Sequence, residues 1–250
     1  MPYRRLPNTN QARLRTLKSA VEQGQKIGDI RNLAFSLKSL EDARSLLIRY
    51  ERALDEYKQC SDLQVKSNKN YQETLKMARL YVSHFIQVVN MCVLRKEIKA
   101  EFKLLYGLQP ENTVVPDLST DEKLLEWGQK VINGEHDRQM KGGAPIYNPS
   151  IQKVKVFYEN FAELENKQKV LQANTVRKME EVNTLNKEVD AIILQIWDEV
   201  ESTYANKEEE EKLDKCKEYG IIYYYRRAEK RKMSMADTNS LENSVSLQEI

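Results

Sequence analysis

The stretches SLEDARSLLIRYERALDEY (residues 39–57) and YQETLKMARLYVSHFIQVVNMC (residues 71–92) decide the fold of this chain. Their apolar residues recur at alternating intervals of three and four, which places them on one stripe of a helix. Between the two stretches the same positions hold the polar residues Ser61, Gln64 and Asn68, so the phase is kept. We therefore predict one very long helix over about residues 39–106, ending at Gly107. Its stripe comprises Leu40, Ala43, Leu47, Tyr50, Leu54, Tyr57, Tyr71, Leu75, Ala78, Val82, Phe85, Val89 and Cys92.

A second heptad pattern follows and predicts a second very long helix over about residues 150–207. Here too the middle of the stripe is polar, with Gln168, Thr175 and Lys178. Neither helix can bury its stripe alone, so we expect them to pair antiparallel. The predicted class is all-α, an elongated antiparallel long-helix bundle with short covering helices. The apolar positions of the second stripe are Val154, Phe157, Phe161, Leu164, Leu171, Val182, Leu185, Val189, Ile192 and Ile196.

Shorter helices are expected to cover the two ends of this pair. Residues 8–10 provide N-cap side chains for a first helix, and residues 119–122 fit a capping box that opens a helix ending near Gly134 or a few residues beyond. The stretch from Leu80 to Leu94 is apolar nearly all round, so we expect it to be covered on every side. Trp197 and its apolar neighbours should be covered by the first helix and by residues 213–225.

Two registers of the antiparallel pair keep the stripes in phase, with facing residue numbers that sum to roughly 256 or roughly 242. We prefer the second, because it places Gln64 near Lys178. The competing fold breaks both helices, near Ser67–Asn70 and Ala173–Thr175, into a compact four-helix bundle. A loop has no reason to preserve the heptad phase, and neither stretch contains Gly or Pro, so continuous helices are favoured.

Composition bounds the class of protein and its compartment. The chain has 250 residues and a net charge of +2, so no overall field attracts it to nucleic acid or membrane. Its three cysteines are far apart, which suits a reducing compartment, and no secretory signal is evident, so we expect a cytoplasmic protein. We assign residues 1–232 to a single elongated helical domain and residues 233–250 to a disordered tail.

The sequence contains few groups that suit catalysis, metal or cofactor binding. His84 lies in an apolar helix and is expected to be a hydrogen-bonded core residue, whereas His136 is expected in a solvated segment. Cys92 lies on the buried stripe and is interpreted as a small core residue. No phosphate-binding loop, GxSxG elbow or HExxH motif occurs. We therefore predict no enzyme activity, no catalytic or metal residues and no cofactor.

One local charge cluster supports a nucleic-acid-binding alternative. Basic residues follow a tyrosine run, and Arg4, Arg5, Arg13, Arg15 and Lys18 are expected at the same end of the bundle. Such residues bind single-stranded nucleic acid through phosphate contacts and stacking. The competing interpretation is that residues 221–225 pack on the bundle and the basic residues are solvated. The candidate contacts are Arg226, Arg227, Lys230, Arg231 and Lys232.

Four segments resemble an uncharacterised family of helical bacterial proteins. They are LYVSHFIQVVN (residues 80–90), LLYGLQPENTVVPDLS (residues 104–119), GAPIYNPSIQKV (residues 143–154) and CKEYGIIYYYR (residues 216–226). The resemblance implies a bacterial cytoplasmic setting and assigns no activity. The leading hypothesis is thus a non-enzymatic structural or protein-interaction protein that docks partners or a second copy of itself, without a membrane or a small-molecule substrate.

Overall fold

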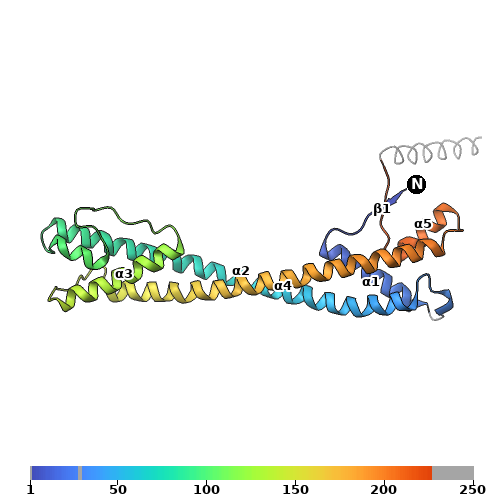
Figure 1. The fold of residues 1–250 in the computed structure, drawn as a ribbon, viewed down its shortest axis with the longest axis horizontal. Coiled ribbons are helices and arrows are strands. Elements are labelled where there is room, and N and C mark those ends of the chain that lie inside the picture. Colours follow the sequence, from blue (N-terminus) through green and yellow to red (C-terminus); the bar gives the residue numbers. More distant parts are fainter. Residues whose placement is uncertain (1, 28–29, 227–250) are drawn as a thin grey trace, which may run out of the picture. The chain divides into compact units, whose positions relative to one another are not determined.

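The computed structural model describes residues 2–27 and 30–226, so the predicted tail, residues 233–250, lies outside the described residues. Two very long helices, α2 and α4, pack together with shorter covering helices, which confirms the all-α class (Figure 1). The elements in order are β1 (Tyr3–Arg4), α1 (Asn10–Lys26), the 3₁₀ helix η1 (Ile30–Asn32), α2 (Leu37–Leu94), the 3₁₀ helix η2 (Ala100–Tyr106), α3 (Asp121–Met140), α4 (Ile151–Thr203), α5 (Glu209–Glu218) and β2 (Tyr223–Tyr224).

The chain divides into two compact units. Unit 1 combines the residues up to Tyr57 with those from Lys178 onward, and unit 2 is the continuous segment Lys58–Arg177. Both long helices contribute to both units. α2 runs through residues 67–70 and α4 through residues 173–175 without a break, so the alternative compact four-helix bundle is wrong.

The predicted ends of the long helices are partly wrong. α2 ends at Leu94, not at Tyr106, because Lys96 adopts a left-handed conformation with φ of 61°. The amides of the next two residues then donate to the Cys92 carbonyl and close the helix end. Gly107 does take the predicted left-handed cap, with φ of 72°, but it caps η2. α4 starts after Ser150 as predicted and ends at Thr203, four residues before the predicted end.

In unit 1 the two long helices run antiparallel in a register that differs from the preferred one. The Lys178 Nζ lies 2.7 Å from a Glu56 carboxylate oxygen, whereas the preferred register faces Lys178 with Gln64. The Tyr50 hydroxyl donates to Asn186 Oδ1 at 2.6 Å, which fixes the same alignment. The helices are therefore displaced by about one heptad, a shift that keeps both stripes in phase.

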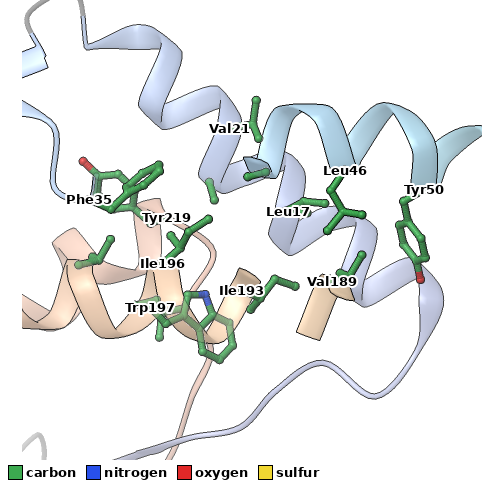
Figure 2. Packing of buried hydrophobic residues seen from close by; sticks show 14 of the residues in the cluster. Leu17, Val21, Phe35, Leu46, Tyr50, Val189, Ile193, Ile196, Trp197 and Tyr219 are labelled. Atoms are coloured by element: carbon green, nitrogen blue, oxygen red, sulfur yellow. The ribbon is translucent and has the colours of Figure 1, made fainter. Parts of the chain in front are cut away.

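The core of unit 1 is covered as predicted, by α1 and by the segment that follows α4. Figure 2 shows Leu17 and Val21 of α1 directed at the α2–α4 pair, with Trp197 of α4 in the same cluster. Cys216, Tyr219 and Ile221 are also buried in this cluster. β1 and β2 form a two-stranded antiparallel sheet in which Tyr3 pairs with Tyr224.

In unit 2, α3 and η2 pack on the α2–α4 pair, and Leu124 and Val131 of α3 are fully buried. The helix begins at the predicted capping segment, residues 119–122; Thr120 is the N-cap, and its hydroxyl accepts a hydrogen bond from the Lys123 amide. The helix passes Gly134 and ends at Met140, because Gly134 is a packing residue and no terminator. A Cβ there would lie 2.7 Å from the Leu105 carbonyl oxygen, so glycine is needed where η2 crosses α3.

A buried ion pair within α3 is hydrogen-bonded to Tyr106 of η2. Glu135 is completely buried and Arg138 is 3% exposed. The Arg138 Nη2 lies 2.8 Å from Glu135 Oε1, and the Tyr106 hydroxyl donates to Glu135 Oε2 at 2.5 Å. Burial opposes ionisation of Glu135, but hydrogen bonds from Arg138 and Tyr106 outweigh it and lower its pKa. The buried charges are thus matched within unit 2.

Candidate interaction surface

Unit 2 leaves one apolar stripe of α2 uncovered. The prediction that this part of the helix is covered on every side is therefore wrong. The interpretation of His84 as a core residue is also wrong, because His84 is exposed. We call the six positions Met77, Leu80, His84, Gln87, Met91 and Leu94 the α2 stripe; its four apolar members are 37%, 56%, 55% and 62% exposed.

The α2 stripe lies opposite the core of unit 2. Val82, Phe85 and Val89 are fully buried and face the interior. Each residue of an α-helix turns by roughly 100°, so the α2 stripe is centred roughly 180° from these three side chains. The same helix segment thus carries two apolar faces, of which unit 2 covers one.

Hydrogen bonds and an aromatic stack fix the neighbours of the α2 stripe on both sides. On one side Asn90 Nδ2 donates to the Thr113 carbonyl at 2.9 Å, which holds the loop between η2 and α3. On the other side Tyr81 stacks on Phe157 with ring centroids 4.3 Å apart. These contacts cover the flanks of the helix and leave a narrow apolar ridge between them.

The order of apolar and polar positions in the α2 stripe is the same in both directions. Along the helix it runs Met, Leu, His, Gln, Met, Leu, with the two polar residues in the centre. The intervals are three, four, three, four and three, so they are also unchanged by reversal. A helix with such a pattern is complementary to an antiparallel copy of itself.

The apolar character of α2 also meets a simple test for membrane helices. One 18-residue window of α2 has a mean hydropathy of 1.3. By length and composition alone, the helix is therefore long and apolar enough to cross a membrane. A third of that window is buried inside the protein. A lipid surface is therefore a competitor that any test of the α2 stripe must include.

The basic cluster predicted from the sequence is described only at its first residue. Arg226 is exposed. Arg227, Lys230, Arg231 and Lys232 lie outside the described residues. Three of the five other basic side chains expected at this end are engaged with carboxylates in unit 1, which reduces the local positive field. The pairs are Arg4 with Asp198 and Glu201, Arg13 with Asp190, and Lys18 with Glu51.

The remaining candidate residues stand apart from one another. Cys92 is half-buried, and burial together with a hydrogen bond involving Glu97 raises the pKa of its thiol, so the unreactive thiol form is favoured. His136 is exposed, as predicted. Among the described residues, no group of three or more His, Cys, Asp and Glu side chains is arranged to hold a metal ion.

Comparison with known proteins adds no assignment. No family model matches the chain, and neither the curated proteins nor the solved structures gave a match. The chain is thus an all-helical protein with no recognised family or named homologue, and its surface must be interpreted from its own residues.

Sequence reasoning missed the α2 stripe although a signal for it was present. Leu80, Met91 and Leu94 belong to the stretch that is apolar nearly all round, and this pattern predicted that it is covered on every side. Their own spacing of three and four, together with Met77, His84 and Gln87, marks a second helical face.

Proposed function

We propose that the chain is a non-enzymatic protein-interaction protein that binds a second copy of itself through the α2 stripe. The observation that carries this proposal is the exposed heptad stripe on the solvent side of α2, whose spacing and apolar–polar pattern are symmetric on reversal. Exposed apolar residues scattered singly are normal, but four on one helical stripe are typical of a helix-binding surface.

The proposed pairing is antiparallel and two-fold symmetric. It places Met77 opposite Leu94 of the second copy and Leu80 opposite Met91 of the second copy. His84 then meets Gln87 of the second copy at the centre. A polar pair at the centre of an otherwise apolar helix contact fixes its register at some cost in affinity.

The expected affinity is low. Complete burial of a Leu or Met side chain contributes about 1.5–3 kcal/mol, so the four partly exposed side chains contribute about 1 kcal/mol each. Eight such side chains in the dimer contribute about 8 kcal/mol, against a cost of association of about 4 kcal/mol or more. With the lowest figure for that cost, the net gain is about 4 kcal/mol, so the α2 stripe alone supports a dissociation constant of about 1 mM, a weak and reversible dimer.

Nucleic-acid binding through a basic end remains the second candidate function. It has less support, because the ion pairs of Arg4, Arg13 and Lys18 neutralise part of the positive charge that it requires. It predicts salt-sensitive retention on a DNA or RNA column that disappears when residues 226–250 are removed.

Sedimentation equilibrium of the full chain at about 0.02–2 mM tests the proposal, because that range spans the expected dissociation constant. We expect a monomer–dimer equilibrium that disappears in the double variant Leu80→Glu, Met91→Glu. The matched control is Val156→Glu, Val170→Glu, since these residues of α4 are 55% and 60% exposed and lie off the stripe. Loss of the dimer in both double variants, or in neither, would contradict the proposal.

Charge complementation and cysteine pairing test the geometry. A Leu80→Lys, Met91→Lys chain mixed with the double Glu variant should restore a one-to-one dimer, although neither associates alone. In a background without Cys60 and Cys92, a Met77→Cys chain mixed with a Leu94→Cys chain should form a disulfide, and neither chain should do so alone. Disulfides within each single variant indicate parallel pairing and contradict the model of association.

Co-sedimentation with lipid vesicles separates self-association from membrane binding. Vesicles of phosphatidylcholine alone and with phosphatidylserine should leave the wild-type chain in the supernatant. The α2 stripe would instead be assigned to a membrane surface by two results together. The wild-type chain would stay monomeric without lipid, and it would bind vesicles in a way that the double Glu variant does not.

A further inference from the structure

Unit 2 contains a cavity of about 670 Å³ that is separate from the α2 stripe. It lies between the end of α2, the turn that leads into η2, and the segment that follows α3. Its volume falls within the range of small-molecule sites, about 300–1,000 Å³. The lining residues are Val88, Cys92, Arg95, Glu97, Ile98, Lys99, Phe102, Arg138 and residues 142–148.

One nitrogen of a buried guanidinium has no protein partner in this cavity wall. Arg138 Nε lies 2.9 Å from the Tyr106 hydroxyl and 3.0 Å from Glu135 Oε2. Its Nη2 donates to Glu135 Oε1 at 2.8 Å and to the Ala144 carbonyl at 2.6 Å. Within residues 2–27 and 30–226, Nη1 has no hydrogen-bond acceptor and is not a fully buried atom, so it is the edge of the guanidinium that solvent reaches.

The structural role of Arg138 accounts for the hydrogen bonds of two of its guanidinium nitrogens and does not involve the third. Balancing Glu135 and holding the Ala144 carbonyl requires Nε and Nη2 only. Nη1 lies beside Gly143, where a Cβ would approach it to 2.5 Å, so glycine at this position leaves room for the guanidinium edge. A donor that solvent reaches at the wall of a cavity binds water, and an acceptor group of a ligand can replace that water.

The charges around the cavity favour a monoanion. Arg95 and Lys99 line it together with Arg138, and Glu97 is the acidic residue of the lining. Glu135, behind the wall, balances Arg138. The two remaining cations face one carboxylate, which leaves an excess of one positive charge.

Part of the lining is apolar, although Asn148 and Tyr147 also contribute polar groups. Phe102, Ile98 and Ile146 provide an aromatic and two branched surfaces next to the cations. A ligand that matches both parts has one anionic group and an apolar body, because pockets of this kind bind through hydrophobic area and a few placed polar groups.

We propose that this cavity binds a small monocarboxylate with an apolar body. The carboxylate accepts a hydrogen bond from Arg138 Nη1 between the ammonium of Lys99 and the guanidinium of Arg95. The apolar body lies against Phe102 and Ile146.

Ligand-observed NMR titration of the full chain with 4-phenylbutyrate and with benzoate tests this site. Benzyl alcohol, which lacks the charge, should bind at least about tenfold more weakly, because a charge-assisted hydrogen bond is lost. Phenyl phosphate distinguishes the anionic group, and tighter binding of phenyl phosphate than of both carboxylates would overturn the assignment to a monocarboxylate.

Variants that leave the buried ion pair intact locate the binding. Ala144→Trp fills the cavity from an exposed position and should abolish binding of 4-phenylbutyrate. Arg95→Ala and Lys99→Ala should each weaken it about twofold to fivefold, as expected for exposed cations. Lys141→Ala is the matched control, since this exposed residue does not line the cavity, and should bind as the wild type does. Binding that survives Ala144→Trp, or no binding to the wild type, would overturn the proposal.

Discussion

Replacement of Glu135 by glutamine should destabilise unit 2 strongly. The carboxylate accepts hydrogen bonds from Tyr106, Arg138, Gln139 Nε2 at 2.9 Å and the Ile146 amide at 3.3 Å. Glutamine removes the charge that balances a guanidinium that is 3% exposed, and it turns one acceptor into a donor facing donors. Removal of one partner of a buried ion pair costs about 3–5 kcal/mol of unfolding free energy.

Glu165→Gln is the matched control for this substitution. Glu165 is also buried, at 4% exposure, but the side chain of its partner Lys169 is 64% exposed. Water can therefore solvate the lysine when the carboxylate is lost, and the expected cost is about 1 kcal/mol or less.

The two tryptophans provide an assay that distinguishes the units. Trp127 lies in unit 2 and Trp197 in unit 1, and the chain has no other tryptophan. In a Trp197→Phe background, urea unfolding followed by Trp127 fluorescence reports the unfolding of unit 2. The effect of Trp197→Phe on stability is shared by all the chains compared, so it cancels in the difference between variants. The reasoning is refuted if Glu135→Gln loses no more unfolding free energy than Glu165→Gln.

Three further outcomes are expected. The pKa of Glu135 is lowered in the folded chain, so the ionised carboxylate contributes its full stabilisation of unit 2 above the ordinary pKa of 4.5. This stabilisation is lost as the pH falls through the folded pKa. Acid titration followed by Trp127 fluorescence should show the loss, and Glu135→Gln should make the unfolding free energy depend less on pH in this range. Gly134→Ala should cost about 1–3 kcal/mol in the Trp127 assay, because the new methyl group meets the backbone of Leu105. Tyr50→Phe should cost about 1 kcal/mol in urea unfolding followed by Trp197, through loss of the hydrogen bond to Asn186.

Most of the helical architecture could be predicted because heptad spacing is a strong signal for helices. The phase that persists through Ser61, Gln64 and Asn68 correctly indicated an unbroken helix. The Thr120 cap was also predictable, since a hydroxyl followed by acidic residues marks a helix start. By contrast, nothing local marks Lys96 as a left-handed residue, so the end of α2 was placed too late.

The register and the buried network depend on contacts between residues far apart in sequence. Heptad phase alone permits several registers, and specific pairs such as Tyr50 with Asn186 select one of them. Glu135 and Arg138 look like an ordinary surface pair at a spacing of three. Their burial follows from the approach of η2 at Gly134, and neither their spacing nor their residue types indicate it.

The division of the chain has a consequence for its synthesis. Unit 2 is one continuous segment, whereas unit 1 needs the residues up to Tyr57 and those from Lys178 onward. On the ribosome, α1 and the first part of α2 therefore cannot complete the burial of their apolar side chains until residues 178–226 are made. During this interval Leu17, Leu46 and Tyr50 form an exposed surface on the nascent chain, which chaperones recognise. Unit 2, made in between, can complete its own packing first.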